Sequence, residues 1–354
     1  MDPLTQMALG AAVGQAGFHR RLGRRAALVG AVAALLPDLD IVPVAFMGPL
    51  AEWRYHRGIT HSLWFGLVVG PVLGAAIARW EWRRAPGPAP GPDPGRLRAW
   101  IALLVLAIVT HPLLDVFTIY GTQLLAPFST RRFALSAVPI IDPAYTAILV
   151  AALAVGLLRP ARVRLAAAAA CAALVLGTGY LFLGLAQNAR AEAEARRQLA
   201  ASGVRYDRVR VYTTIFQIWL RRVVVWTPDE VRVGFVSTWS PQPIRWTRYP
   251  IPESPLVDRV RATEAGRTFE WFTSGETLAA VRQADGGGVV IELTDLRYGL
   301  PGGNERGFWG VRGVFDAEGR LVSEPTRFSI PRQVDRGALG ALVRAAFGRP
   351  NDRY

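Results

Sequence analysis

The sequence predicts a membrane α-helical bundle of five or six hydrophobic helices, followed by a β-rich extramembrane domain. Hydrophobic residues make up 51% of the 354 residues, charged residues only 19%, and the mean hydropathy is +0.22. This composition is more apolar than that of an ordinary soluble protein. Long apolar segments lie before residue 187, whereas β-branched runs follow residue 204. We therefore expect a membrane half and a second half outside the membrane.

Five apolar segments approach or exceed the roughly 20 residues that a helix needs to cross a bilayer. They occupy about 26–47, 62–80, 99–120, 134–158 and 163–186. A sixth segment, 4–18, is rich in Ala and Gly and is shorter. This segment is compatible with a short span, a re-entrant helix or an interfacial helix. Together with the five longer segments it predicts a transmembrane domain over residues 1–186.

The distribution of arginine predicts the orientation of the spans. All 41 basic residues are Arg, and the net charge is +14. Many of them punctuate apolar runs instead of forming a basic patch with stacking aromatics, so no nucleic-acid partner is expected. Arg residues cluster in the loops around 20–25, 79–98 and 159–164. The positive-inside rule makes these loops cytoplasmic and places the loops 48–61 and 121–133 outside.

The remaining segments are predicted from local composition. Residues 85–95 alternate Pro with Gly and Ala, which indicates a flexible linker. Residues 187–203 are strong helix formers and predict a helical stalk. Residues 204–354 contain β-branched runs such as 223–226, 231–236, 289–293 and 309–315 between Pro/Gly turns, which predicts a β-rich extracytoplasmic domain. That domain holds no His and no Cys.

Seven ionisable side chains lie inside or beside the apolar segments, where a charge is costly unless it is paired, hydrated or metal-bound. They are Asp38, Asp40, His56, His61, His111, Asp115 and Asp142. Asp38 and Asp40 follow Pro37, a pattern that helix capping alone also explains, and a short Gly-containing turn separates His56 from His61. The i, i+4 spacing places His111 and Asp115 on one helix face.

The depth of these groups in the membrane predicts that they meet. Asp38 lies 13 residues beyond Arg25, and His111 lies 13 residues beyond Arg98. At the helical rise, both reach about 20 Å from the cytoplasmic edge. Asp142 enters from the outer end of its segment, and His56 and His61 lie on the adjoining outer loop. We therefore expect the set to converge on the outward half of the bilayer.

A set of imidazoles and carboxylates without thiolates suits a divalent metal, with zinc as the first expectation. The predicted ligands are Asp38, Asp40, His56, His61, His111 and Asp115, which are enough for one or two ions. A proton or ion relay through the bundle and a structural polar network are the alternatives. Few polar residues continue toward the cytoplasm, because 26–36 and 99–109 contain no charge. A one-sided pocket fits this pattern better than a pathway.

Several motifs resemble the YdjM-type family of bacterial membrane-bound metal-dependent hydrolases, some of them described as LexA-regulated. They are MDPLTQMALGAAVGQ, LLPDLDIV, HRGITHS, HPLLDVFTIYGTQLLAPFS and IIDP, and the resemblance covers about residues 1–190. It implies a multi-span protein of the bacterial inner membrane with a divalent-metal site at Asp38, Asp40, His56, Arg57, Thr60, His61, His111, Asp115 and Asp142. Many relatives carry Thr-His near the N-terminus where this chain has Thr5-Gln6.

The expected function is a membrane-bound metal-dependent hydrolase that acts on a phosphoester or ester of a lipid or lipid-linked substrate at the outer face. Asp142 or Asp40 is the candidate general base, and Arg57 could stabilise phosphate charge, although it could equally snorkel to lipid headgroups. Membrane lipids and a lipid-linked substrate are the expected partners, and the sequence does not identify a protein partner. The alternative is a non-enzymatic protein that uses the cluster for ion or proton transport, metal sensing or a structural metal.

Overall fold

The computed structural model describes residues 1–354 apart from 85–92, 285–286, 302–305, 331–335 and 349–354. Most of the predicted linker 85–95 therefore lies outside the described residues. The chain divides into two compact units. The first comprises Met1–Phe46 and Tyr55–Leu183, and is helical. The second comprises Met47–Arg54 and Gly184–Tyr354, and holds the β-strands.

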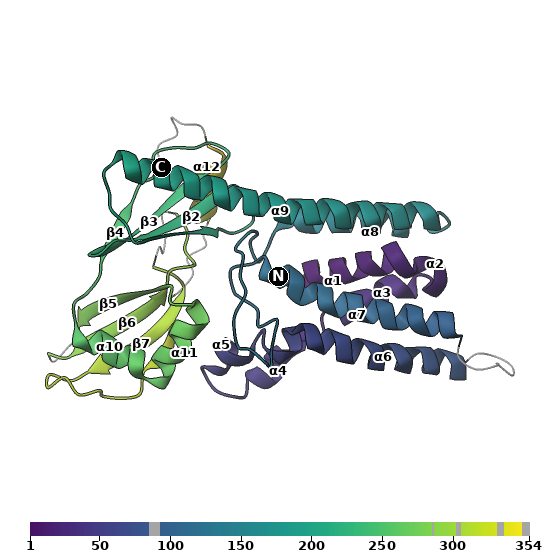
Figure 1. The fold of residues 1–354 in the computed structure, drawn as a ribbon, viewed down its shortest axis with the longest axis horizontal. Helices are drawn as coiled ribbons and strands as arrows, with labels where there is room; N and C mark the ends of the chain where they lie inside the picture. The colour runs from purple at the N-terminus through teal and green to yellow at the C-terminus, as the bar shows by residue number, and fades with distance from the viewer. Residues whose placement is uncertain (85–92, 285–286, 302–305, 331–335, 349–354) are drawn as a thin grey trace. The chain divides into compact units, whose positions relative to one another are not determined.

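The helical unit combines long helices with short helical turns, and a long irregular segment, residues 117–142, joins α7 to α8 (Figure 1). Its helices are α1 Pro3–Val13, α2 His19–Leu22, α3 Arg25–Ala33, α4 Ile41–Val44, α6 Leu63–Arg83, α7 Pro94–Val116, α8 Pro143–Leu158 and α9 Val163–Ala201, which continues into the second unit. A π-helical turn, η1, covers Gly14–Phe18, and the 3-10 turns η2 and η3 cover Pro37–Asp40 and Ile59–His61.

Four helical stretches among the described residues are long and apolar enough to cross a membrane. They are Arg25–Val44, Leu63–Arg83, Pro94–Val116 and Val163–Ala201. The shorter apolar helix α8 has 16 residues because Asp142 caps it and Pro143 occupies its first position. The predicted segment 134–158 is thus helical only from residue 143. The predicted membrane bundle followed by a β-rich domain is confirmed.

Small residues let the helices of this unit approach closely. Gly66, Gly70 and Gly74 recur at i, i+4 on α6 and are buried. A Cβ added at Gly70 would lie 2.8 Å from the Cα of Val105 on α7. Helices that meet in a bilayer pack through such small residues, since lipid supplies no hydrophobic force between them. The close α6–α7 pair positions the part of α7 that carries His111 and Asp115.

The second unit contains two four-stranded antiparallel sheets, ordered β1-β2-β3-β4 and β5-β6-β7-β8. Their strands are β1 Arg208–Thr213, β2 Leu220–Trp226, β3 Glu230–Ser237, β4 Thr247–Pro250, β5 Thr277–Gln283, β6 Val289–Asp295, β7 Trp309–Phe315 and β8 Thr326–Ser329. The helices are α5 Ala51–Tyr55, whose last residue belongs to the first unit, α10 Pro255–Ala262, α11 Glu264–Thr273 and α12 Arg336–Phe347.

Strand β2 is buried over almost its whole length, and its residues 223–226 form an apolar run, because helices cover both faces of its sheet. Val223 and Val225 pack against Ala191, Ala195 and Leu199 of α9. On the alternate face, Leu220 packs against Leu342 and Ala346 of α12. A strand covered on both sides reads as an apolar run and not as an alternation. The predicted stalk 187–203 is therefore mostly the C-terminal part of α9, packed on this sheet.

The segment 47–54 is held in the second unit by one buried tryptophan. Trp53 is 1% exposed, and its ring lies 4.8 Å from the ring of Phe269 and 5.7 Å from that of Phe272, both on α11. Arg54 donates to Thr268 Oγ1 and pairs with Glu264, and Glu52 pairs with Arg327. A loop between two apolar segments is thus part of the core of the β-containing unit.

Candidate metal centre

Three separate elements of the helical unit bring Asp38, His61 and His111 together. Asp38 comes from η2, His61 from η3 and His111 from α7. His61 Nε2 lies 3.1 Å from His111 Nε2, and Asp38 Oδ1 lies 3.3 and 3.4 Å from these two nitrogens. One ligand atom from each residue falls within 4.8 Å of the others. The set can therefore surround one divalent cation.

Local sequence explains why these side chains converge. Pro37 begins η2, so the apolar segment from Arg25 to Val44 is not one regular helix, and its carboxylates are displayed at a turn. Gly58 adopts an irregular backbone before η3, which turns His61 inward. On α7, His111 and Asp115 lie one turn apart, and Asp115 Oδ2 is 3.5 Å from the Nε2 atom of each histidine.

The outer nitrogen of each histidine is already hydrogen-bonded. His111 Nδ1 lies 2.5 Å from the carbonyl oxygen of Ala34, which can only accept a hydrogen bond. His61 Nδ1 lies 3.3 Å from Asp40 Oδ2 and 3.1 Å from Thr60 Oγ1. Both Nδ1 atoms are therefore the protonated ones in neutral rings, which leaves both Nε2 lone pairs facing each other. Two lone pairs at 3.1 Å beside carboxylates require a cation or a proton between them.

Asp40 organises the loop that carries His61. Its Oδ1 atom lies 2.8 Å from His56 Nδ1, and its Oδ2 atom accepts hydrogen bonds from the Arg57 backbone N–H and from Thr60 Oγ1. The hydrogen bonds of this carboxylate thus stabilise the backbone turn between His56 and His61. The structure gives Asp40 and His56 contacts on the Nδ1 side of His61, and their role as direct ligands stays a prediction. Asp38 is the carboxylate that lies beside both Nε2 atoms.

Arg57 and Asp115 form a buried pair next to the three ligands. Arg57 is 2% exposed, its Nε atom lies 3.1 Å from Asp115 Oδ2, and its Nη1 atom donates to Thr118 Oγ1 at 3.0 Å. Its guanidinium also lies 4.9 Å from the centre of the Tyr120 ring. The side chain therefore points into the protein and does not snorkel to the membrane surface.

Gln6 on α1 is a site residue that the sequence argument did not identify as a contact. Its Nε2 atom donates to Asp115 Oδ1 at 3.1 Å and to the backbone carbonyl of His111 at 3.3 Å. The Oε1 atom of Gln6 is buried without a hydrogen-bond partner. The signal in the sequence was the pair Thr5-Gln6, which stands where many relatives carry Thr-His. A buried oxygen without a partner, on a residue that contacts Asp115, fits a cation site nearby.

Asp142 occupies a different position from the one predicted for it. Its Oδ1 atom accepts hydrogen bonds from the backbone N–H groups of Ala144 and Tyr145, and the Tyr180 hydroxyl donates to the same carboxylate. These contacts make Asp142 the N-cap of α8. None of them joins it to Asp38, His61 or His111, so its role as a general base stays a prediction.

The exposed edge of the site is at Asp38. The side chains of His61 and His111 are fully buried, whereas that of Asp38 is 24% exposed. Its neighbours Leu39, Ile41 and Val42 are all exposed apolar residues. Exposed apolar residues in a membrane-spanning segment are suited to contact lipid, so the exposed edge of Asp38 lies next to a lipid-compatible surface.

Comparison with known protein families gives one match, which covers the helical half of the chain. The YdjM inner membrane protein family matches residues 1–190, which is more than half of the sequence. This range contains all the residues of the candidate metal centre. No solved structure matches the chain significantly.

Two curated proteins are similar over part of their length. The inner membrane protein YbcI of Escherichia coli (strain K12) is 37% identical over 111 residues, which cover 31% of this chain and 57% of YbcI. The uncharacterized protein YfhP of Bacillus subtilis (strain 168) is 30% identical over 154 residues, which cover 40% of this chain and 42% of YfhP. The match thus spans less than two thirds of either relative.

Proposed function

We propose that this chain, which belongs to the YdjM inner membrane protein family, is a metal-dependent hydrolase. The observation that carries the proposal is the pair of Nε2 atoms, His61 and His111, that face each other at 3.1 Å beside Asp38. Each ring has its other nitrogen committed elsewhere, so a divalent cation is the group that best satisfies both lone pairs. Two imidazoles and one carboxylate leave room for water or substrate.

Asp38, His61 and His111 would hold the ion, with Asp115 Oδ2 within reach of the same position. Zinc is the metal we expect first for this ligand set, although non-haem iron also uses two histidines and one carboxylate. When bound, such an ion supplies Lewis acidity that activates water and polarises an ester or phosphoester oxygen. Asp115 Oδ2 also lies 3.1 Å from Arg57 Nε, so the same carboxylate would link the ion to the buried guanidinium.

The substrate class we propose is a phosphoester or ester of a lipid or lipid-linked molecule. The buried Arg57 guanidinium, held by Asp115 and Thr118, offers a fixed cation for an anionic oxygen. The exposed residues Leu39 and Val42 beside Asp38 would accommodate an acyl or polyprenyl chain. We further propose that the site opens at the outer leaflet and that the β-containing unit is extracytoplasmic.

Elemental analysis of the purified full-length protein tests the metal. The wild type should hold a stoichiometric divalent ion, His61→Ala and His111→Ala should lose it, and Asp142→Asn should keep it. A screen of lipid phosphoesters and carboxylic esters then tests hydrolysis with the same variants. Absence of metal from the wild type would refute the proposal that the protein is a metal-dependent hydrolase. Bound metal together with hydrolysis that is indifferent to both histidine variants would favour transport, sensing or a structural metal.

A further inference from the structure

Four exposed apolar side chains of the second unit form one surface, which we call the α12 patch. They are Trp239, Leu339, Val343 and Phe347, with 61%, 38%, 57% and 43% of their surfaces exposed. The three residues on α12 recur at i, i+4, so they form a stripe along one side of the helix. The Trp239 ring lies 6.2 Å from the Phe347 ring, which joins the loop after β3 to the end of this stripe.

The fold of the unit does not account for this patch. Helix α12 already buries Leu342 and Ala346 against Leu220 of β2, so its attachment to the sheet uses a different face. The patch is also preorganised. Ser237 Oγ donates to the carbonyl of Ala346 at 2.6 Å and accepts from the backbone N–H of Trp239 at 3.1 Å. An ordered apolar surface beyond the needs of the core indicates an interaction site.

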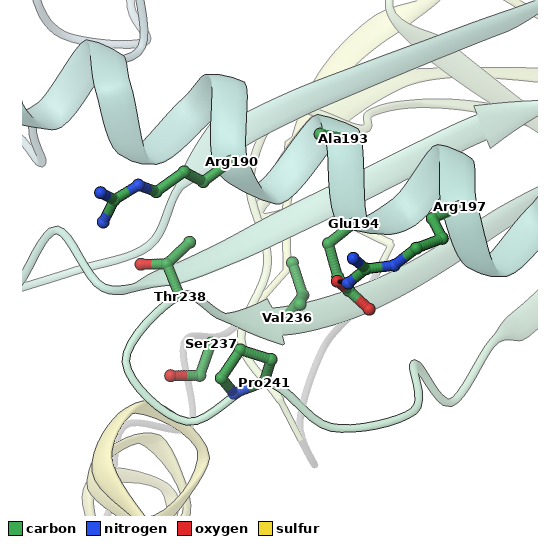
Figure 2. A pocket seen from close by; sticks show the side chains of 8 residues that line it. All are labelled: Arg190, Ala193, Glu194, Arg197, Val236, Ser237, Thr238 and Pro241. Atoms are coloured by element: carbon green, nitrogen blue, oxygen red, sulfur yellow. Dashed lines mark ion pairs between the residues drawn. The ribbon is translucent and has the colours of Figure 1, made fainter.

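The surroundings of the patch are basic. A pocket of about 270 Å³ borders the loop that follows β3 and is lined by Thr238, Pro241 and three α9 side chains, Arg190, Glu194 and Arg197 (Figure 2). Glu194 pairs with Arg197, which leaves Arg190 as the further positive charge of this lining. Arg344 lies in the last turn of α12, and the sequence of this helix contains no acidic residue. Arg190 and Arg344 therefore make the charge around the apolar stripe positive.

We infer that the α12 patch docks onto an anionic phospholipid surface, namely the bilayer in which the same chain is embedded. A tryptophan with aliphatic neighbours and flanking arginines is the composition of segments that lie in a membrane interface. Arginines near an anionic surface strengthen such binding electrostatically. Because the same chain carries membrane-spanning helices, this docking would be an intramolecular event, which raises the effective concentration of the bilayer for the patch. This inference does not depend on the hydrolase proposal.

Site-specific labelling of the full-length protein tests the inference. Cys171, the one cysteine of the chain, is replaced in a Cys171→Ser background, and Val343→Cys is labelled with bimane. The protein is reconstituted into phosphatidylcholine vesicles with and without phosphatidylglycerol, and headgroup-level nitroxide lipids serve as the quencher. The matched control is Val322→Cys, because Val322 is a valine of the same unit with 62% exposure.

The expected result is several-fold stronger quenching at residue 343 than at residue 322 in vesicles that contain phosphatidylglycerol. Trp239→Ala and Arg190→Gln should each reduce this difference, and removal of phosphatidylglycerol should do the same. Equal quenching at both positions would overturn the inference, as would quenching that is independent of the anionic lipid. Pyrene excimer emission from Val343→Cys would identify a second copy as the occupant and would also overturn it.

Discussion

Asp40 tests how a side chain could influence the proposed metal site through the outer nitrogen of a ligand histidine. It contacts His61 Nδ1, the Arg57 N–H and Thr60 Oγ1 through a single oxygen. Asp40→Asn keeps the shape but removes the charge that fixes the tautomer of His61. Loss of such an outer partner typically costs about 10–100-fold in metal affinity. We expect the metal affinity of Asp40→Asn to fall by about this factor, while one equivalent of metal still binds at saturation. Competition with a chelator measures both quantities.

Asp142→Asn is the matched control for this prediction, because it changes a buried carboxylate that caps α8. Its metal affinity should equal that of the wild type. If Asp40→Asn binds no metal at any concentration while the control binds normally, Asp40 is itself a ligand and our assignment is incorrect.

Glu276 supplies a pH-dependent contribution in the second unit. Burial raises the pKa of this carboxyl above its ordinary value of 4.5, although Arg208 and Arg210 lie nearby and oppose the shift. The unfolded chain therefore releases this proton first as the pH rises, and the free energy of unfolding falls from pH 4.5 through the raised pKa. Chemical denaturation of the full-length protein over this range should show the fall.

Glu276→Gln should flatten that dependence, since the neutral amide has no proton to release. Exposed Glu253 provides a comparison, and Glu253→Gln should leave the slope of the wild type in place. An unchanged slope in Glu276→Gln would assign the pH dependence to another group.

The residues of the metal centre were predictable in part from the sequence. Charged groups at membrane depth identified Asp38, His61, His111 and Asp115, because such groups are costly without partners. The roles of Asp40 and Asp142 were not predictable, since a carboxylate after or before proline looks the same whether it binds metal, caps a helix or orients a histidine. The amide of Gln6 carried no comparable signal.

At the scale of elements, the long helices followed from apolar runs of bilayer length, but their ends did not. Segment 134–158 contains only the 16-residue α8, because Asp142 and Pro143 provide a strong helix start within it. Strands β2, β3, β6 and β7 coincide with the β-branched runs. The remaining strands have mixed sequences such as RVRVYT and TLAAVRQ, whose pairing depends on tertiary contacts.

The α6–α7 contact yields a prediction at the same scale. A methyl group at Gly70 would lie 2.7 Å from Val105 Cγ2 and 2.8 Å from its backbone nitrogen, so one helix backbone must move. Gly70→Ala should destabilise the helical unit by about 1–3 kcal/mol, the range for overpacking. Gly179 on α9 has no atom within 4 Å of an added Cβ. Gly179→Ala should therefore be neutral or stabilising by up to about 1 kcal/mol.

Thermal unfolding in detergent, followed by circular dichroism, measures both changes. The expected result is a lower unfolding temperature for Gly70→Ala than for Gly179→Ala. If Gly70→Ala unfolds at the temperature of the wild type, α6 and α7 do not pack at the distance described here.

At the scale of the whole molecule, one segment belongs to a structural unit that no sequence pattern indicated. Residues 47–54 lie between two apolar segments, yet they belong to the β-containing unit. Burial of Trp53 between Phe269 and Phe272 is a tertiary contact separated by more than 200 residues in the sequence. Local periodicity cannot predict such a contact. It requires residues 47–54 and the C-terminal unit to share one side of the membrane.

This requirement combines with the positive-inside rule to give a prediction of topology. Arg159, Arg162 and Arg164 mark the α8–α9 connection as cytoplasmic, so the segment 47–54 and the β-containing unit should both be extracytoplasmic. In a Cys171→Ser background, a membrane-impermeant maleimide added to intact spheroplasts should label Phe46→Cys and Val322→Cys. Ala161→Cys should react only after the membrane is permeabilised. Labelling of residue 161 before permeabilisation, with protection of residue 322, would invert the orientation and place the site's opening in the inner leaflet.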